Sequence, residues 1–117
     1  MSTIYAERNI LLYMDSLKPG GVPEDVVVRQ IREAYVLEEG KFEIHSVYVQ
    51  KQRNVDCGVY SIANIWNVLS NGDPRSTRFL ESSIRNQLYE SFKQGKLHFD
   101  RRKCKARRLP RKYIYQF

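Results

Sequence analysis

Asp56-Cys57-Gly58, followed by the apolar run Val59–Leu69, is the stretch around which the 117-residue chain is organised. Before it, the segment Val47–Asn54 has the pattern of a short strand that breaks into a polar turn. The order strand, turn, cysteine, helix predicts that Cys57 lies in the first turn of a helix, where unpaired backbone N–H groups and the helix dipole favour a negative charge. The thiolate is the nucleophilic form of cysteine, so this position favours reactivity. The alternative is that Cys57 is a small buried residue at the start of a core helix.

The composition is that of one small globular domain or of part of a larger one, with 42% hydrophobic and 28% charged residues. No apolar run approaches the ~20 residues of a membrane span, and Met1–Leu12 lacks the basic region that opens a signal peptide. Two cysteines, Cys57 and Cys104, allow at most one disulfide and favour a reducing compartment, so an intracellular location, nuclear or cytoplasmic, is expected. The Cys and His spacing matches no zinc site, and no metal or cofactor is expected.

The net charge of +7 is concentrated at the C-terminal end of the chain. Residues 101–117 contain no acidic side chain and eight basic ones, which are Arg101, Arg102, Lys103, Lys105, Arg107, Arg108, Arg111 and Lys112. Residues 1–100 hold the other 12 basic and all 13 acidic side chains, so we divide the chain into a near-neutral body, 1–100, and a basic tail, 101–117. Such clusters are typical of nucleic-acid or targeting patches. The alternative is a solubilising, partly disordered terminus in which Cys104 is an incidental thiol.

Apolar patterning predicts two strands and three helices in the body. The strands are Asn9–Met14 and Phe42–Gln50. The helices are Pro23–Val36, Gly58–Leu69 and Thr77–Gln94, with turns at Lys18–Gly21 and Asn71–Pro74. A stable sheet usually needs three or more strands, so two strands suggest that a further part of the sheet lies upstream. Tyr113–Phe117 alternates like a short strand and is able to dock on the body or to stack on bases.

Polar side chains follow the ends of both predicted strands. Asp15 ends the first strand and Cys57 follows the second, and in a parallel βαβ arrangement these ends meet at the same sheet edge. A cysteine nucleophile needs a base, an acid that orients the base, and donors for the oxyanion. Amides for the oxyanion are available from Gln50, Gln52 and Asn54. The sequence therefore predicts a thiol site at this edge.

An obvious histidine is missing from this set. His45 lies within the second predicted strand and His98 follows the last helix, so neither is expected to act as the base. Structural interpretations also exist for the other candidates: Asp15 as a turn or capping residue, and Gln50 and Gln52 as solvated turn residues. Asp56 is a favoured N-cap, and Trp66 is interpreted as a core residue.

The segment Gln52-Arg53-Asn54-Val55-Asp56-Cys57-Gly58-Val59-Tyr60 resembles the nucleophile segment of the ubiquitin-like-protein-specific (SUMO) protease family, relatives of the adenovirus protease. Tyr13-Met14-Asp15-Ser16-Leu17 is similar to the strand end of that family that carries its aspartate. The resemblance covers roughly residues 9–97. It implies the C-terminal part of a papain-like α+β cysteine peptidase fold, with a short sheet packed on helices, and it implies thiol isopeptidase chemistry on ubiquitin-like conjugates or precursors.

By this resemblance Cys57 is the nucleophile, Asp15 orients the catalytic histidine and Gln52 donates to the oxyanion. The family glutamine lies one residue further from the cysteine than Gln52 does, so Gln50 stays as an alternative. The family histidine lies one strand and turn before the aspartate, which corresponds to a position at or before Met1. A helix end stabilises a nearby charge by about 0.3–1 kcal/mol, rarely ~2, whereas a paired imidazolium also protonates the leaving amine. We therefore expect Cys57 to react with alkylators but to turn over an isopeptide poorly.

Two other functions fit the sequence. The first is an inactive remnant that still binds a ubiquitin-like modifier. The second is a nucleic-acid-binding protein that uses Arg101–Lys112 and has a structural cysteine. If all eight basic side chains of the tail met phosphates of duplex DNA, the log–log salt slope of binding would be about −7.

Overall fold

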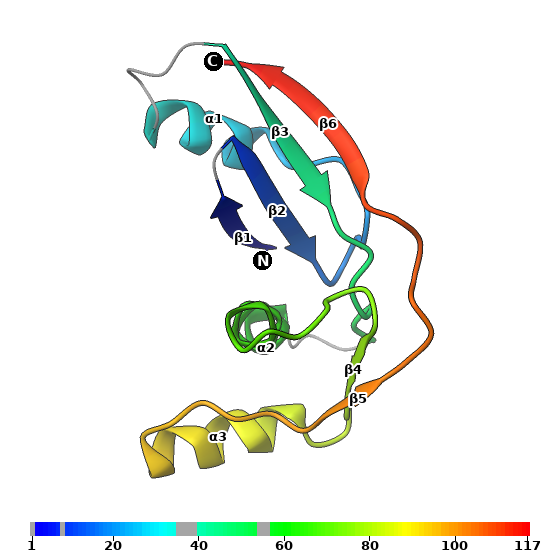
Figure 1. The fold of residues 1–117 in the computed structure, drawn as a ribbon. Helices are drawn as coiled ribbons and strands as arrows, with labels where there is room; N and C mark the ends of the chain where they lie inside the picture. Colours follow the sequence, from blue (N-terminus) through cyan, green and yellow to red (C-terminus); the bar gives the residue numbers. More distant parts are fainter. Residues whose placement is uncertain (1, 8, 35–39, 54–56) are drawn as a thin grey trace.

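A short mixed sheet with one helix packed on a face forms the upper part of the molecule in Figure 1, and a second helix lies below it. The computed structural model describes residues 2–7, 9–34, 40–53 and 57–117. The sheet has the strand order β1-β2-β3-β6, with β1 (Ser2–Glu7), β2 (Ile10–Asp15), β3 (Lys41–Ser46) and β6 (Arg111–Gln116). Strands β2 and β3 are parallel, and the other two pairs are antiparallel. The chain is therefore a small α+β domain.

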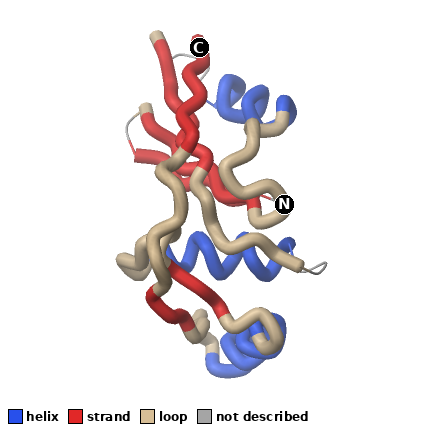
Figure 2. The backbone as a smooth tube through the Cα atoms, turned by 90° about the vertical axis from the view of Figure 1, so that its right-hand side faces the viewer, coloured by secondary structure: helices blue, strands red, loops and turns tan. Residues whose placement is uncertain are grey.

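The helices lie in separate layers. Helix α1 (Asp25–Ala34) connects β2 to β3 and packs on one face of the sheet, where Leu11, Tyr13, Phe42 and Ile44 are buried. Helix α2 (Cys57–Leu69) packs against β1 and β2. Beyond α2 lie α3 (Ile84–Gln94) and a two-stranded ribbon of β4 (Thr77–Phe79) and β5 (Arg101–Lys103). Figure 2 shows α2 lying between the sheet and α3.

Most of the predicted elements of the body are confirmed. The parallel β2–α1–β3 unit is present, and Gly21 N donates to Lys18 O at 2.9 Å in the predicted turn. The predicted helix before Asn71 is α2, and Asn71 adopts a left-handed φ of 65° just past its end. Gly95 caps α3 in the same conformation, with a φ of 68°.

The sheet contains two strands besides the two that were predicted for the body. The two additional strands come from Ser2–Glu7, which the sequence left unassigned, and from the tail, whose Arg111–Gln116 pairs along the whole of β3. Stacking fixes β6 in place: the rings of Phe42 and Tyr115 are 5.3 Å apart, and Phe117 is 4.8 Å from Phe42. The alternating segment of the tail thus docks on the body.

The predicted helix Thr77–Gln94 is wrong at its start, because Thr77–Phe79 is strand β4 and α3 begins at Ile84. The backbone of Phe79 exchanges two hydrogen bonds with the Gln50 side chain, at 2.6 and 3.2 Å. Thr77 Oγ1 accepts from Asn67 Nδ2 at 3.0 Å. These long-range contacts hold the segment extended in spite of its helical spacing.

The docked C-terminal strand carries a phenol whose ionisation opposes folding. Burial, and after it the neighbouring Tyr113, raise the pKa of Tyr115 above its ordinary value of 10.0. The neutral phenol is favoured in the folded state, so its contribution is present below pH 10 and is lost as the pH rises through the raised value. We expect the free energy of unfolding, from urea titrations, to fall above that pH by more in the native protein than in Tyr115→Phe. An equal fall in both would contradict this.

Candidate active site

The edge of the sheet at which β2 ends carries a buried carboxylate. Asp15 is 6% exposed, and its Oδ1 accepts a hydrogen bond from Leu17 N at 2.9 Å. Asp15 therefore does act as a turn residue, through its hydrogen bond with Leu17 N. Among the described residues, this is the single hydrogen bond to the carboxylate, so Oδ2 remains available to orient another group.

The segment that follows β3 is fastened across this edge through Ser16. Gln52 N donates to Ser16 O at 3.0 Å, and Ser16 Oγ donates to Gln52 Oε1 at 2.5 Å. Gln52 is 5% exposed. The two contacts fix both the backbone and the amide plane of Gln52 beside the residue that follows Asp15 in the chain.

The second glutamine is committed elsewhere. Gln50 is 8% exposed, its Nε2 donates to Phe79 O, and its Oε1 accepts from Phe79 N. Gln50 is thus a side-chain partner for β4, and both polar atoms of its amide are bonded to Phe79. Both glutamines are buried, which rules out the interpretation of solvated turn residues, and Gln52 is the one that lies at the Asp15 edge.

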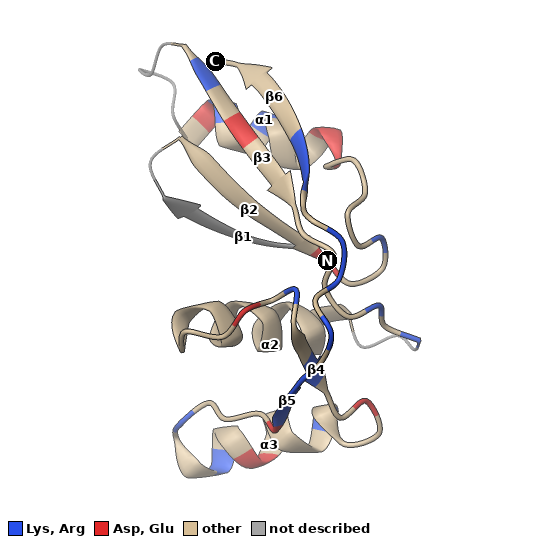
Figure 3. Cartoon of the chain, turned by 45° about the vertical axis from the view of Figure 1, so that its right-hand side comes forward, with Lys and Arg blue, Asp and Glu red and all other residues tan. Residues whose placement is uncertain are grey.

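Cys57 is the first residue of α2, as predicted, and it is a partly exposed free thiol. A Cβ built on the neighbouring Gly58 would meet no atom within 4 Å, so the surroundings of the first helical turn are open. In Figure 3 helix α2 lies below the edge at which β2 ends. The predicted N-cap Asp56 and the amide of Asn54 lie outside the described residues.

A cavity of about 730 Å³ lies beside Gln52. Its lining includes Gln52, Arg53, Arg78, Leu80 and Glu81. The loop before Cys57 is held to the far wall, because Arg53 N donates to Glu81 Oε1 at 3.1 Å. A chain segment that enters this cavity would therefore pass the Gln52 side chain.

Neither histidine lies at the edge. His45 is opposite Leu12 and Lys112 within the sheet, and its Nε2 is 3.7 Å from Glu43 Oε2. In the parallel register Asp15 lies three residues further along the strands, which corresponds to about 10 Å. His98 lies in the other half of the molecule, where its ring contacts Trp66 edge-on at 5.7 Å.

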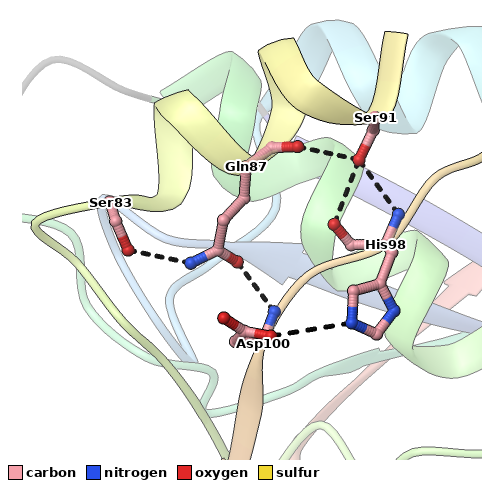
Figure 4. Close-up of polar contacts among 5 residues, drawn as sticks. All are labelled: Ser83, Gln87, Ser91, His98 and Asp100. Atoms are coloured by element: carbon pink, nitrogen blue, oxygen red, sulfur yellow. Dashed lines mark hydrogen bonds and ion pairs between the residues drawn. The ribbon is translucent and has the colours of Figure 1, made fainter. Parts of the chain in front are cut away.

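A serine, histidine and aspartate meet near α3, but their geometry is structural (Figure 4). The hydroxyl of Ser91 contacts the backbone of His98 rather than its ring: it accepts from the N–H at 3.0 Å, and its one proton lies between the carbonyls of Gln87, at 2.8 Å, and His98, at 3.0 Å. Asp100 N donates to Gln87 Oε1 at 2.7 Å. Ser91 is 4% exposed. The set therefore fastens residues 98–100 to α3 and presents no nucleophile to solvent.

The sequence did not identify Ser16 as the residue that holds Gln52, although Ser16 stands inside the quoted Asp-Ser-Leu motif. The sequence also provided no basis for distinguishing the basic residues of the tail from one another. Arg107 Nη1 donates to the carbonyls of Pro74, Arg75 and Thr77, and Arg101 is bound to Asn67 and Ser70. Two of the eight basic residues therefore have structural partners that no local pattern indicated.

Within the described residues, no group of three or more His, Cys, Asp or Glu side chains is arranged to hold a metal ion. The helices that the structure describes are all too short or too polar to cross a membrane. Comparisons with protein-family models, with curated proteins and with solved structures gave no match to this chain.

Proposed function

We propose that this chain carries the thiol half of a papain-like cysteine peptidase site that acts on the C-terminal tail of a ubiquitin-like modifier. The observation that carries the proposal is the double contact between Gln52 and Ser16, which fixes an amide beside the buried Asp15 carboxylate at the sheet edge. The likeness of the Asp-Ser-Leu and Asp-Cys-Gly segments to the SUMO protease family supplies the substrate class.

In the proposed reaction the Cys57 thiolate attacks the carbonyl carbon of the modifier's last residue. An S–C bond forms, and the C–N bond to the amine breaks. The negative charge that develops on the carbonyl oxygen is stabilised by the Gln52 amide and by backbone N–H groups of the first turn of α2. The leaving amine needs a proton from a histidine that Asp15 orients. Since His45 and His98 lie elsewhere, the chain is proposed to bind the modifier tail and to be acylated slowly.

Reaction with an activity-based probe tests the proposal. A ubiquitin-like modifier with a C-terminal electrophile is expected to label the native chain, and Cys57→Ala is expected to abolish labelling completely. Gln52→Ala is expected to lower the labelling rate by about 10²–10³-fold, which is the typical cost of one lost oxyanion donor. Labelling is measured as the mass shift of the intact protein against time.

The second cysteine provides the matched control, because Cys104 is also a partly exposed free thiol. Cys104→Ala is expected to be labelled as fast as the native chain. Binding of the modifier without labelling would instead support a non-catalytic modifier-binding domain. Loss of labelling in Cys104→Ala, with Cys57→Ala unaffected, would refute the site.

A further inference from the structure

Two arginines face each other across the β4–β5 ribbon without an acidic partner. Arg78 and Arg102 are directly opposed in the antiparallel register, and both are exposed. Directly opposed like charges destabilise a strand pair. Within the described part of the chain, the side chain of neither arginine forms an ion pair or a hydrogen bond. A local conflict of this kind is expected at functional sites.

The opposed arginines line a cavity of about 550 Å³ between α2 and the ribbon. This volume lies in the range of about 300–1,000 Å³ that is typical of small-ligand sites. Trp66, Phe79 and Phe99 provide aromatic lining, and Asp100 is the acidic residue among the lining side chains. Asp100 is 3.6 Å from His98 Nε2, so a basic group already faces it. The cavity therefore combines aromatic surface with excess positive charge.

A planar guanidinium is fixed at the wall of this cavity. Arg101 lies over the ring of Trp66, with its Cζ 4.6 Å from the ring centroid. Its Nη1 donates to Asn67 Oδ1 at 2.8 Å and to Ser70 Oγ at 2.6 Å. Arg101 is exposed, so one face of the fixed guanidinium is available. Arginine planes and aromatic rings are the surfaces on which unpaired bases stack.

The remaining cations continue from the cavity along the connection between β5 and β6. Figure 3 shows Lys and Arg following this extended segment from the ribbon up to the sheet. With Arg101 and Arg107 bound to other groups, seven cations are left along this track: Arg78, Arg102, Lys103, Lys105, Arg108, Arg111 and Lys112. A linear row of exposed cations beside a stacking surface matches the alternation of phosphates and bases in a single strand.

We propose that this cavity and the cation track, independently of Cys57, bind single-stranded nucleic acid. A base stacks on the Arg101 guanidinium, its phosphate lies between Arg78 and Arg102, and the following phosphates lie along residues 103–112. A duplex is excluded from the cavity because its bases are paired and stacked inside the helix. An acidic peptide offers carboxylates but no planar base for Arg101.

Fluorescence anisotropy with a labelled DNA strand of about twelve nucleotides, a length within the usual site sizes, tests the proposal. Seven phosphate contacts predict a log–log salt slope of about −5, at about −0.7 for each contact on a single strand. Arg78→Gln/Arg102→Gln is expected to reduce the slope to about −3.5 and to leave the protein folded, since it removes a repulsion. The fluorescence of Trp66, the one tryptophan of the chain, is expected to change on binding.

The matched control is Arg29→Gln/Lys96→Gln, which removes the same charge from two exposed residues away from the track. It is expected to leave the slope unchanged. Arg101→Lys keeps the positive charge but removes the planar guanidinium. It is expected to weaken binding of the base-containing DNA strand about tenfold and to leave binding of an abasic strand of equal length unchanged. Equal losses in the two double variants, binding of a duplex as tight as of the single strand, or full competition by polyglutamate would overturn the proposal.

Discussion

Ser2→His is expected to make Cys57 a catalyst that turns over. Hydrolysis of an amide at the C-terminus of a ubiquitin-like modifier should become about 10²–10⁴-fold faster, which is the usual contribution of a positioned acid–base group. The physical reason is the β1–β2 register, in which the Cα atoms of Ser2 and Asp15 are partners. Residues directly opposite in an antiparallel pair have Cβ atoms about 4.5–5.5 Å apart. A histidine introduced at position 2 is therefore expected to bring an imidazole within reach of the Asp15 carboxylate.

Two variants separate this effect from a general gain in basicity. Thr3→His moves the substitution one residue along β1, where the backbone partner is Met14 instead of Asp15, and it is expected to give no gain. Ser2→His/Asp15→Asn keeps the imidazole but loses the group that orients it, and is expected to lose most of the gain. Release of a fluorescent amine measures all three variants. Equal gains in Ser2→His and Thr3→His would show that Asp15 has no part in the chemistry.

Gly20→Ala is expected to lower the free energy of unfolding by about 2–5 kcal/mol, a large share of the roughly 5–15 kcal/mol of a small domain. Gly20 has a φ of +70°, and a Cβ there would overlap the ring of Tyr48. Backbone strain and overpacking thus act together at the turn between β2 and α1. Urea denaturation followed by circular dichroism measures the loss.

Gly40→Ala is the matched control for this turn. Gly40 has a φ of +96°, but a Cβ there would meet nothing within 4 Å, so only the backbone strain of about 1–2 kcal/mol is expected. The difference between the two variants measures the contact with Tyr48. If both variants lose the same free energy, the Tyr48 ring does not press on this turn.

The part of the fold that could be predicted from the sequence is the part set by local pattern. The β2–α1–β3 unit and the helix that starts at Cys57 follow from periodicity and turn residues that are adjacent in the chain. Strand β6 pairs with β3 across more than half of the chain length, and its alternating pattern follows a run of basic residues. The spacing of Leu80, Ile84, Leu88 and Phe92 suggested one helical face, yet Leu80 and Phe92 are 50% and 68% exposed.

The candidate site was predicted in its residue types but not in its contacts. Asp15 and Cys57 follow from the rule that parallel strands end at one edge. The choice between Gln50 and Gln52 depends on Phe79 and Ser16, each about 30 residues or more away in the chain, and no local pattern indicates such partners. The opposition of Arg78 and Arg102 likewise cannot be predicted until the register of the ribbon is known.

Intramolecular cross-linking between positions 15 and 57 tests most directly whether the sheet edge and the start of α2 form one site. The variant Asp15→Cys, in a Cys104→Ser background, is treated with a short bis-electrophile. Its reach is no longer than the span of an imidazole ring that is hydrogen-bonded at both nitrogens. The linked peptides are identified by mass spectrometry. We expect a cross-link from position 15 to Cys57 and none from Ile10→Cys, at the opposite end of β2. Two singly modified cysteines without a link, or equal linkage from position 10, would contradict a shared site.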